Sequence, residues 1–81
     1  MGSFHEIMQR LKESIITIEK RTKILDKDVA KALGLTAQYF AVIKRREKIP
    51  YEAIALFCQR HRLSINWILL GQQPKYLTWK S

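Results

Sequence analysis

A glycine interrupts an otherwise helical pattern in the middle of this chain. Residues 28–46 read DVAKALGLTAQYFAVIKRR, with Gly34 between two short segments of periodic apolar residues. A glycine inside a helix costs about 1 kcal/mol relative to alanine. A tight turn between helices instead needs a residue that accepts positive φ, which glycine does without a Cβ clash. We therefore predict a turn at Gly34 between two short helices.

Apolar residues recur at helical spacing before this turn, and no strand-like alternation or internal repeat is present. Ser3 and Glu6 have the spacing of a capping box, which predicts the start of a first helix. The charged stretch 19–26 is expected to connect this helix to the next. The residues predicted to face the core from the first helix are Phe4, Ile7, Met8, Leu11, Ile15 and Ile18.

Start and stop signals divide the rest of the chain. Asp26 and Asp28 open a second helix, where carboxylates suit the positive N-terminus, Thr36 caps a third, and Pro50 suits the first turn of a fourth. Ser64 caps a fifth helix, which ends at Gly71. The prediction is an all-α, compact five-helix domain over residues 1–73, with a short C-terminal tail at 74–81.

The second and third helices have the residues that a helix-turn-helix needs. Small Ala30 lies where the third helix would cross the second, and Phe40 and Ile43 share one face of the third helix. The second helix of this motif, the recognition helix, enters the major groove of DNA with its N-terminal part. We predict this role for residues of about 36–46.

Charge and cysteine content restrict the function further. Fifteen Lys and Arg against seven Asp and Glu leave a net charge of +8, which favours a polyanion as partner: nucleic acid, an anionic membrane or an acidic protein. One cysteine excludes an intrachain disulfide or a multi-cysteine zinc site and fits a reducing cytoplasm. No apolar run approaches about 18 residues, so no membrane span is expected.

From Val29 to Gly71 the chain resembles the helix-turn-helix domain of the bacteriophage CI repressor family, within the wider lambda-repressor-like group. The stretches that carry the resemblance are VAKALGLTAQYF, KRREKIPYEAIALFCQ and LSINWILLG. The resemblance implies a five-helix fold and sequence-specific binding to double-stranded operator DNA, usually as a dimer.

The chain departs from the family pattern at three positions. Asp26 stands where relatives often have a phosphate-contacting glutamine; because its charge would repel phosphate, we interpret it only as a helix cap. Ile43 stands where tryptophan is common, so packing under the third helix differs. Arg62 stands where glycine is usual, so this turn is either strained or shaped differently.

Several residues of the third helix are candidates for DNA contact. Gln38 is expected to read a base, because an amide can bond to N6 and N7 of adenine; the alternative is a solvated surface residue. Ala37 and Val42 have methyl groups, which either contact the methyl group of thymine or have no role in DNA binding. Tyr39 either contacts the DNA backbone or is partly buried. The Thr36 hydroxyl either caps the helix, which we expect, or also meets a phosphate.

A basic cluster follows these residues: Lys44, Arg45, Arg46 and Lys48. Such a cluster is either a solvated face or a phosphate-binding surface, and beside a helix-turn-helix we expect phosphate binding. Arg45 is the member expected to reach a base edge. The predicted function is a cytoplasmic, sequence-specific transcriptional regulator of phage repressor type, which binds a two-fold operator as a homodimer and has no membrane partner.

An enzyme is not expected, because the sequence has no nucleophile–base pair, metal cluster or glycine-rich phosphate loop. No metal and no cofactor are predicted. The alternative function is a protein-interaction adaptor on the same fold, antitoxin-like or anti-repressor-like, that acts through the aromatic tail. Tyr76, Leu77 and Trp79 in this tail either fold over the core or belong to a dimer contact. The chain is either a fragment of a longer repressor or a compact regulator.

Overall fold

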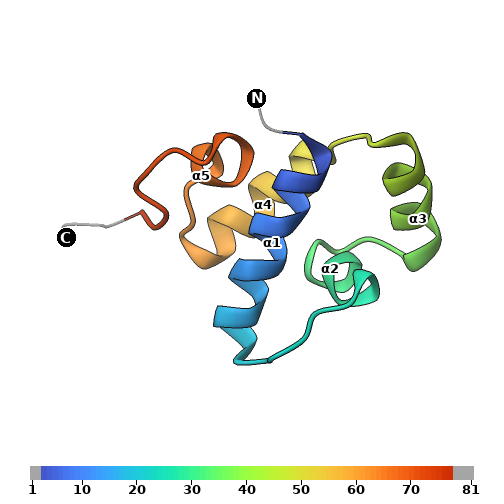
Figure 1. The fold of residues 1–81 in the computed structure, drawn as a ribbon, viewed down its shortest axis with the longest axis horizontal. Helices are drawn as coiled ribbons and strands as arrows, with labels where there is room; N and C mark the ends of the chain where they lie inside the picture. The colour runs from blue at the N-terminus through green and yellow to red at the C-terminus, as the bar shows by residue number, and fades with distance from the viewer. Residues whose placement is uncertain (1–2, 78–81) are drawn as a thin grey trace.

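The computed structural model describes residues 3–77 and folds them into five α-helices, with α1 crossing the centre (Figure 1). The helices are α1 Phe4–Glu19, α2 Asp26–Ala32, α3 Ala37–Arg46, α4 Tyr51–His61 and α5 Ile65–Leu70. Helices α2 and α3 lie on one side of α1, and α5 lies on the other. The predicted all-α, five-helix fold is confirmed. None of the helices formed by the described residues is long and apolar enough to cross a membrane.

One apolar core joins all five helices, and α1 supplies much of it. Its buried residues include Ile7, Leu11 and Ile15 from α1, with Phe57 from α4 and Ile68 from α5. The prediction for Ile18 is wrong: this side chain is 36% exposed. The last turn of α1, residues 16–19, is exposed throughout, so the other described elements leave much of it uncovered.

The ends of the helices follow local signals, with one difference from the prediction. The Ser3–Glu6 capping box forms as predicted, with bonds of 3.0 and 3.2 Å. Pro50 is the N-cap of α4 rather than its first residue. Of the two alternatives given for Arg62, the structure has the strained turn: Arg62 adopts the left-handed conformation, with φ of 56°, which glycine accepts without a steric cost.

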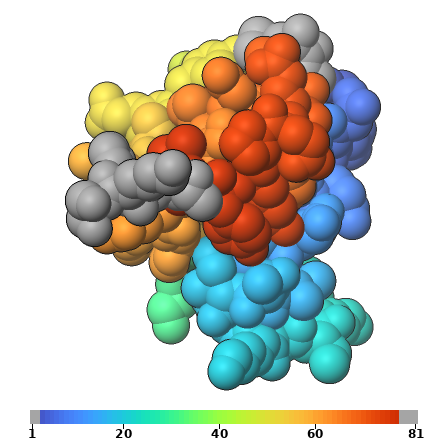
Figure 2. All heavy atoms as spheres, turned by 90° about the vertical axis from the view of Figure 1, so that its left-hand side faces the viewer, coloured from blue at the N-terminus to red at the C-terminus, as the bar shows by residue number. Residues whose placement is uncertain are grey.

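The chain after α5 folds back along the end of α4. The backbone N–H of Ser64 donates to the carbonyl of Lys75 at 2.9 Å, and that of Leu77 donates to the carbonyl of Arg62 at 2.8 Å. The end of the molecule opposite α3 is therefore covered by α5 and the segment that follows it (Figure 2). Tyr76 and Leu77 remain exposed, and Trp79 lies outside the described residues.

One buried polar group on α1 lacks a partner. Ser14 is fully buried, and its hydroxyl makes no hydrogen bond within the described part of the chain. A buried hydroxyl left unpaired costs about 1–3 kcal/mol. We expect Ser14→Ala to raise the free energy of unfolding by about 1 kcal/mol, which is about 4–8 °C in Tm for a domain of this size. Thermal denaturation measures this; a lower Tm would contradict it.

Ser3→Ala, which removes the cap, should shift Tm downward by a similar amount.

Candidate nucleic-acid interface

The turn between α2 and α3 is a Schellman motif centred on Gly34. The N–H of Gly34 donates to the carbonyl of Lys31 at 3.1 Å, and that of Leu35 donates to the carbonyl of Ala30 at 2.8 Å. Gly34 has φ of +72°, as the sequence predicts, and a Cβ added there would meet nothing within 4 Å. The glycine is therefore required for its backbone conformation and not for a close approach.

Helix α3 is held by a cap at its start and by a buried face along its length. The Thr36 hydroxyl accepts a hydrogen bond from the Tyr39 N–H at 3.1 Å. Phe40 and Ile43 are 3% and 2% exposed, as predicted. Ala30 is also buried, so a small side chain on α2 allows α3 to come close. The position and rotation of α3 are consequently set by its apolar contacts.

Gln38 and Arg45 lie on the face of α3 opposite this buried face. They are seven residues apart, which places them about 20° from each other around the helix and about 10 Å apart along it. Both side chains are exposed, and neither forms a hydrogen bond or ion pair with another described residue. Ala41 and Val42 flank this pair; Ala41 is exposed and Val42 is half-buried. An outward strip of α3 is thus left for a partner.

The flank of α3 nearer to α4 carries cations and an aromatic ring. Arg46 and Lys48 are exposed, and Tyr39 is 48% exposed. Tyr39 and Lys48 border the same hollow, beside Pro50. About half of the Tyr39 surface is thus covered and half is accessible, which agrees with both alternatives given for this residue. Positive charge at this end of α3 is also stabilised by the helix dipole, since the last turn is basic.

The opposite flank of α3 borders a groove of about 460 Å³ between α2 and α3. Small and apolar side chains form its floor, and charged side chains from both helices form its rim. The lining residues are Asp26, Lys27, Ala30, Ala37, Phe40, Ala41, Lys44 and Arg45. The groove runs beside the first turn of α3, next to Ala37.

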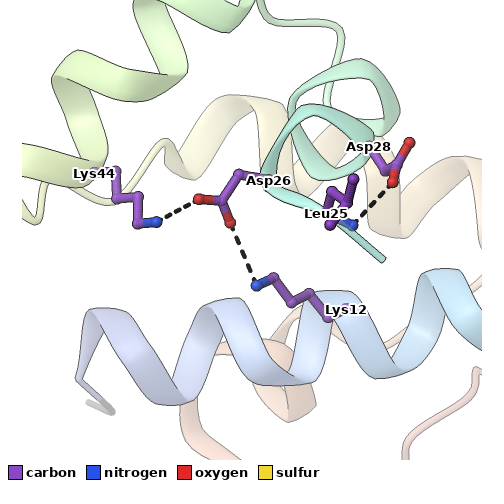
Figure 3. A network of polar contacts seen from close by, with 5 residues as sticks. All are labelled: Lys12, Leu25, Asp26, Asp28 and Lys44. Atoms are coloured by element: carbon purple, nitrogen blue, oxygen red, sulfur yellow. Dashed lines mark hydrogen bonds and ion pairs between the residues drawn. The ribbon is translucent and has the colours of Figure 1, made fainter. Parts of the chain in front are cut away.

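Asp26 joins three helices at the edge of this groove (Figure 3). One carboxylate oxygen of Asp26 accepts a hydrogen bond from the Lys44 ammonium of α3, and the other lies 3.3 Å from Lys12 Nζ of α1. The bond from Lys44, helped by that from Lys12, holds the pKa of Asp26 below its usual value, although partial burial opposes this. The carboxylate is therefore charged at neutral pH.

The interpretation of Asp26 as a helix cap is wrong. The N-cap of α2 is Leu25, and its N–H donates to the Asp28 carboxylate at 2.9 Å. That bond is the main reason that the pKa of Asp28 is lowered. Asp26 is the first residue of α2 and turns toward α3 instead.

The structure brings the sequence-predicted residues together on α3 and its ends. Apart from Val42, which is half-buried, all of them are exposed: Thr36, Ala37, Gln38, Tyr39, Lys44, Arg45, Arg46 and Lys48. The pairing of Lys44 with Asp26 and the contact with Lys12 were not predicted from the sequence. The unusual acidic residue at position 26 was the one available signal.

Residues outside this surface offer little chemistry. Cys58 is 3% exposed, and burial raises the pKa of its thiol to about 11, so it remains protonated at neutral pH. The His61 ring packs against Phe57, with ring centres 4.7 Å apart. Among residues 3–77, no group of three or more His, Cys, Asp or Glu side chains could hold a metal ion.

Comparison with known families agrees with this geometry. The family described as the bacteriophage CI repressor helix-turn-helix domain matches residues 10–76, which run from the middle of α1 to the segment after α5. The resemblance found in the sequence is thereby confirmed. Neither the curated proteins nor the solved structures yielded a match.

Proposed function

The chain belongs to the family of bacteriophage CI repressor helix-turn-helix domains, and from this premise we propose that it is a sequence-specific, double-stranded DNA-binding regulator of transcription. Helix α3 enters the major groove, and its outward strip faces the base edges. The single observation that carries the proposal is the exposure of Gln38 and Arg45 directly opposite the buried face of α3.

In this proposal each candidate residue has one role. Gln38 and Arg45 donate to base edges, while Ala37 and Val42 meet thymine methyl groups. Phosphates are bound by the residues on the flanks of α3 and beside its ends: Thr36, Tyr39, Arg46 and Lys48. Lys44 joins them only where a phosphate displaces the Asp26 carboxylate from it. Phosphate contacts position the domain and carry no sequence information directly, whereas base contacts select the site.

Binding to random and to selected duplexes tests this function. The association constant for random DNA should fall steeply with salt, because each phosphate that is bound releases counterions. A duplex enriched from a random library should bind at least about 10³-fold more tightly than the random pool at the same salt concentration. Equal affinity for all sequences would remove the proposed specificity.

Gln38→Ala should reduce sequence preference without weakening random binding. A bidentate contact between an amide and adenine discriminates by about 1–3 kcal/mol, so the enriched duplex should lose about 5–150-fold in affinity. Titration of both duplexes at one salt concentration measures this. The matched control is Gln59→Ala on α4, an exposed glutamine outside the proposed surface, which should leave both affinities unchanged. An equal loss on both duplexes would assign Gln38 to the DNA backbone.

We also propose that two copies bind a two-fold operator. The major grooves on one side of a duplex repeat about every 34 Å, so each copy of α3 would occupy one half-site. Light scattering of the protein–DNA complex should give two chains per operator. One chain per operator would restrict the proposal to a single half-site.

A second candidate function rests on the exposed apolar residues of the opposite end. Leu70, Tyr76 and Leu77 are 42%, 42% and 47% exposed, and Leu77 borders a hollow beside α4 and α5. A protein-interaction adaptor would use this surface. Tyr76→Ser with Leu77→Ser should then abolish binding to a protein partner while leaving the affinity for DNA unchanged.

A further inference from the structure

The Asp26 carboxylate lies beside the surface that a phosphate would approach on the α2 side of the recognition helix. It borders the groove next to Ala37 and takes the ammonium of Lys44, one of the four cations of the basic cluster. Arg45, Arg46 and Lys48 have no such partner among residues 3–77. The two flanks of α3 therefore differ: cations on the α4 side are unpaired, whereas Lys44 on the α2 side is already neutralised.

We propose that Asp26 acts as an intramolecular competitor of DNA phosphate: by holding Lys44, it lowers the affinity of the protein for duplexes of any sequence. This inference rests on the proposed function, and it names the residue that sets the strength of the phosphate contacts at that surface.

The exposure of the Lys44–Asp26 ion pair indicates that a phosphate can compete for Lys44, which a buried ion pair would not allow. The side chain of Lys44 is 50% exposed and that of Asp26 is 41% exposed, so solvent and a phosphate can both reach them. An exposed ion pair is worth little to stability, typically below about 1 kcal/mol, and exchanging one anion for another at the lysine is correspondingly easy. Lys12, whose Nζ lies 3.3 Å from the other oxygen of Asp26, would still pair with this carboxylate after such an exchange.

The charge at the N-terminus of α2 is a second reason to expect that Asp26 opposes phosphate binding. The dipole of a helix favours a phosphate at its N-terminus. The N-terminus of α2, which has only seven residues, already carries the Asp26 carboxylate as its first residue. The negative charge of Asp26 therefore lies where the DNA phosphate would otherwise bind. The approaching phosphate meets repulsion from Asp26 and finds Lys44 occupied, so both effects act in the same direction.

The test is Asp26→Asn, compared with Asp28→Asn. Both changes remove one negative charge from the first turn of α2, but Asp28 bonds to Leu25 and pairs with Arg21 at 3.0 Å, away from α3. Random and selected duplexes are titrated with each full-length variant from about 50 to about 200 mM salt. Helical circular dichroism and thermal denaturation check that each variant is folded.

Asp26→Asn is expected to bind both duplexes more tightly and to steepen the salt dependence by about one unit, because one more phosphate is neutralised. The ratio of the mutant to the wild-type association constant should therefore fall about threefold over that range of salt. Asp28→Asn should leave the slope at its wild-type value. The Asp26→Asn gain should disappear when Lys44→Met is also present, since the released lysine is then missing.

The outcomes separate the two proposals. A folded Asp26→Asn variant with wild-type or weaker affinity overturns the competition and assigns the ion pairs to holding α1, α2 and α3 together. A gain that persists with Lys44→Met overturns the role of Lys44 and leaves only general charge repulsion. A wild-type protein that binds no duplex at any of these salt concentrations overturns the proposed function itself.

Discussion

Replacing Arg45, Arg46 and Lys48 together by alanine should remove most of the salt-dependent affinity for DNA. Each phosphate contact contributes about 0.9 to the slope of log K against log [salt], so the contacts of Arg46 and Lys48 account for about 1.8 units, and the loss of Arg45 removes a contact with a base edge as well. At about 0.1 M salt the two phosphate contacts correspond to a loss of roughly 10²-fold in affinity. Lys44 is left in place because Asp26 already neutralises it.

The control for this triple variant removes equal charge elsewhere. Lys20, Lys23 and Arg62 lie on the connection after α1 and at the end of α4, and their side chains are exposed. Their combined replacement by alanine lowers the net charge by the same amount but should flatten the slope by far less than one unit. Equal slopes for the two triple variants would show that net charge, rather than a localised surface, drives binding.

Phe40→Ala should destabilise the domain by about 3–5 kcal/mol, the usual cost of truncating a buried aromatic side chain. Phe40 is 3% exposed and packs the buried face of α3 into the apolar core. A domain of this size has a total stability near the low end of about 5–15 kcal/mol, so the substitution should leave little folded protein at 37 °C. Urea denaturation followed by helical circular dichroism measures the loss.

Tyr39→Ala is the matched control, because the two aromatic residues are neighbours in the sequence. Tyr39 is 48% exposed, and we expect its replacement to change the free energy of unfolding by less than about 1 kcal/mol. The same variant should lose affinity for both random and selected DNA if Tyr39 contacts the backbone. Similar destabilisation by both substitutions would contradict the burial of Phe40.

The local features of the fold could be predicted from neighbouring residues. The capping box at Ser3, the positive φ of Gly34 and the cap at Thr36 all form as predicted, since each depends on residues within four positions of one another. The outward position of Gln38 also follows from periodicity, because the inward position of Phe40 sets the rotation of α3.

The errors occurred where packing decided the outcome. Ile18 has the right spacing for the core, but α1 extends past the elements that could cover it. Asp26 has the right residue type for a cap, but the cap bond is made by Asp28. Local patterns identify which side chains could be buried or could accept a bond; they do not say whether another element is present to meet them.

The sequence by itself determined the five helices, the turn between α2 and α3 and the basic outward face of α3, because helical periodicity, capping and left-handed turns depend on short-range interactions. Only the tertiary structure decided that Lys44 is neutralised and that the two flanks of α3 differ. Asp26 and Lys44 are 18 positions apart, and Lys12 belongs to a third helix. Their charges meet only because burial of the apolar faces of α1, α2 and α3 brings the three helices to one point.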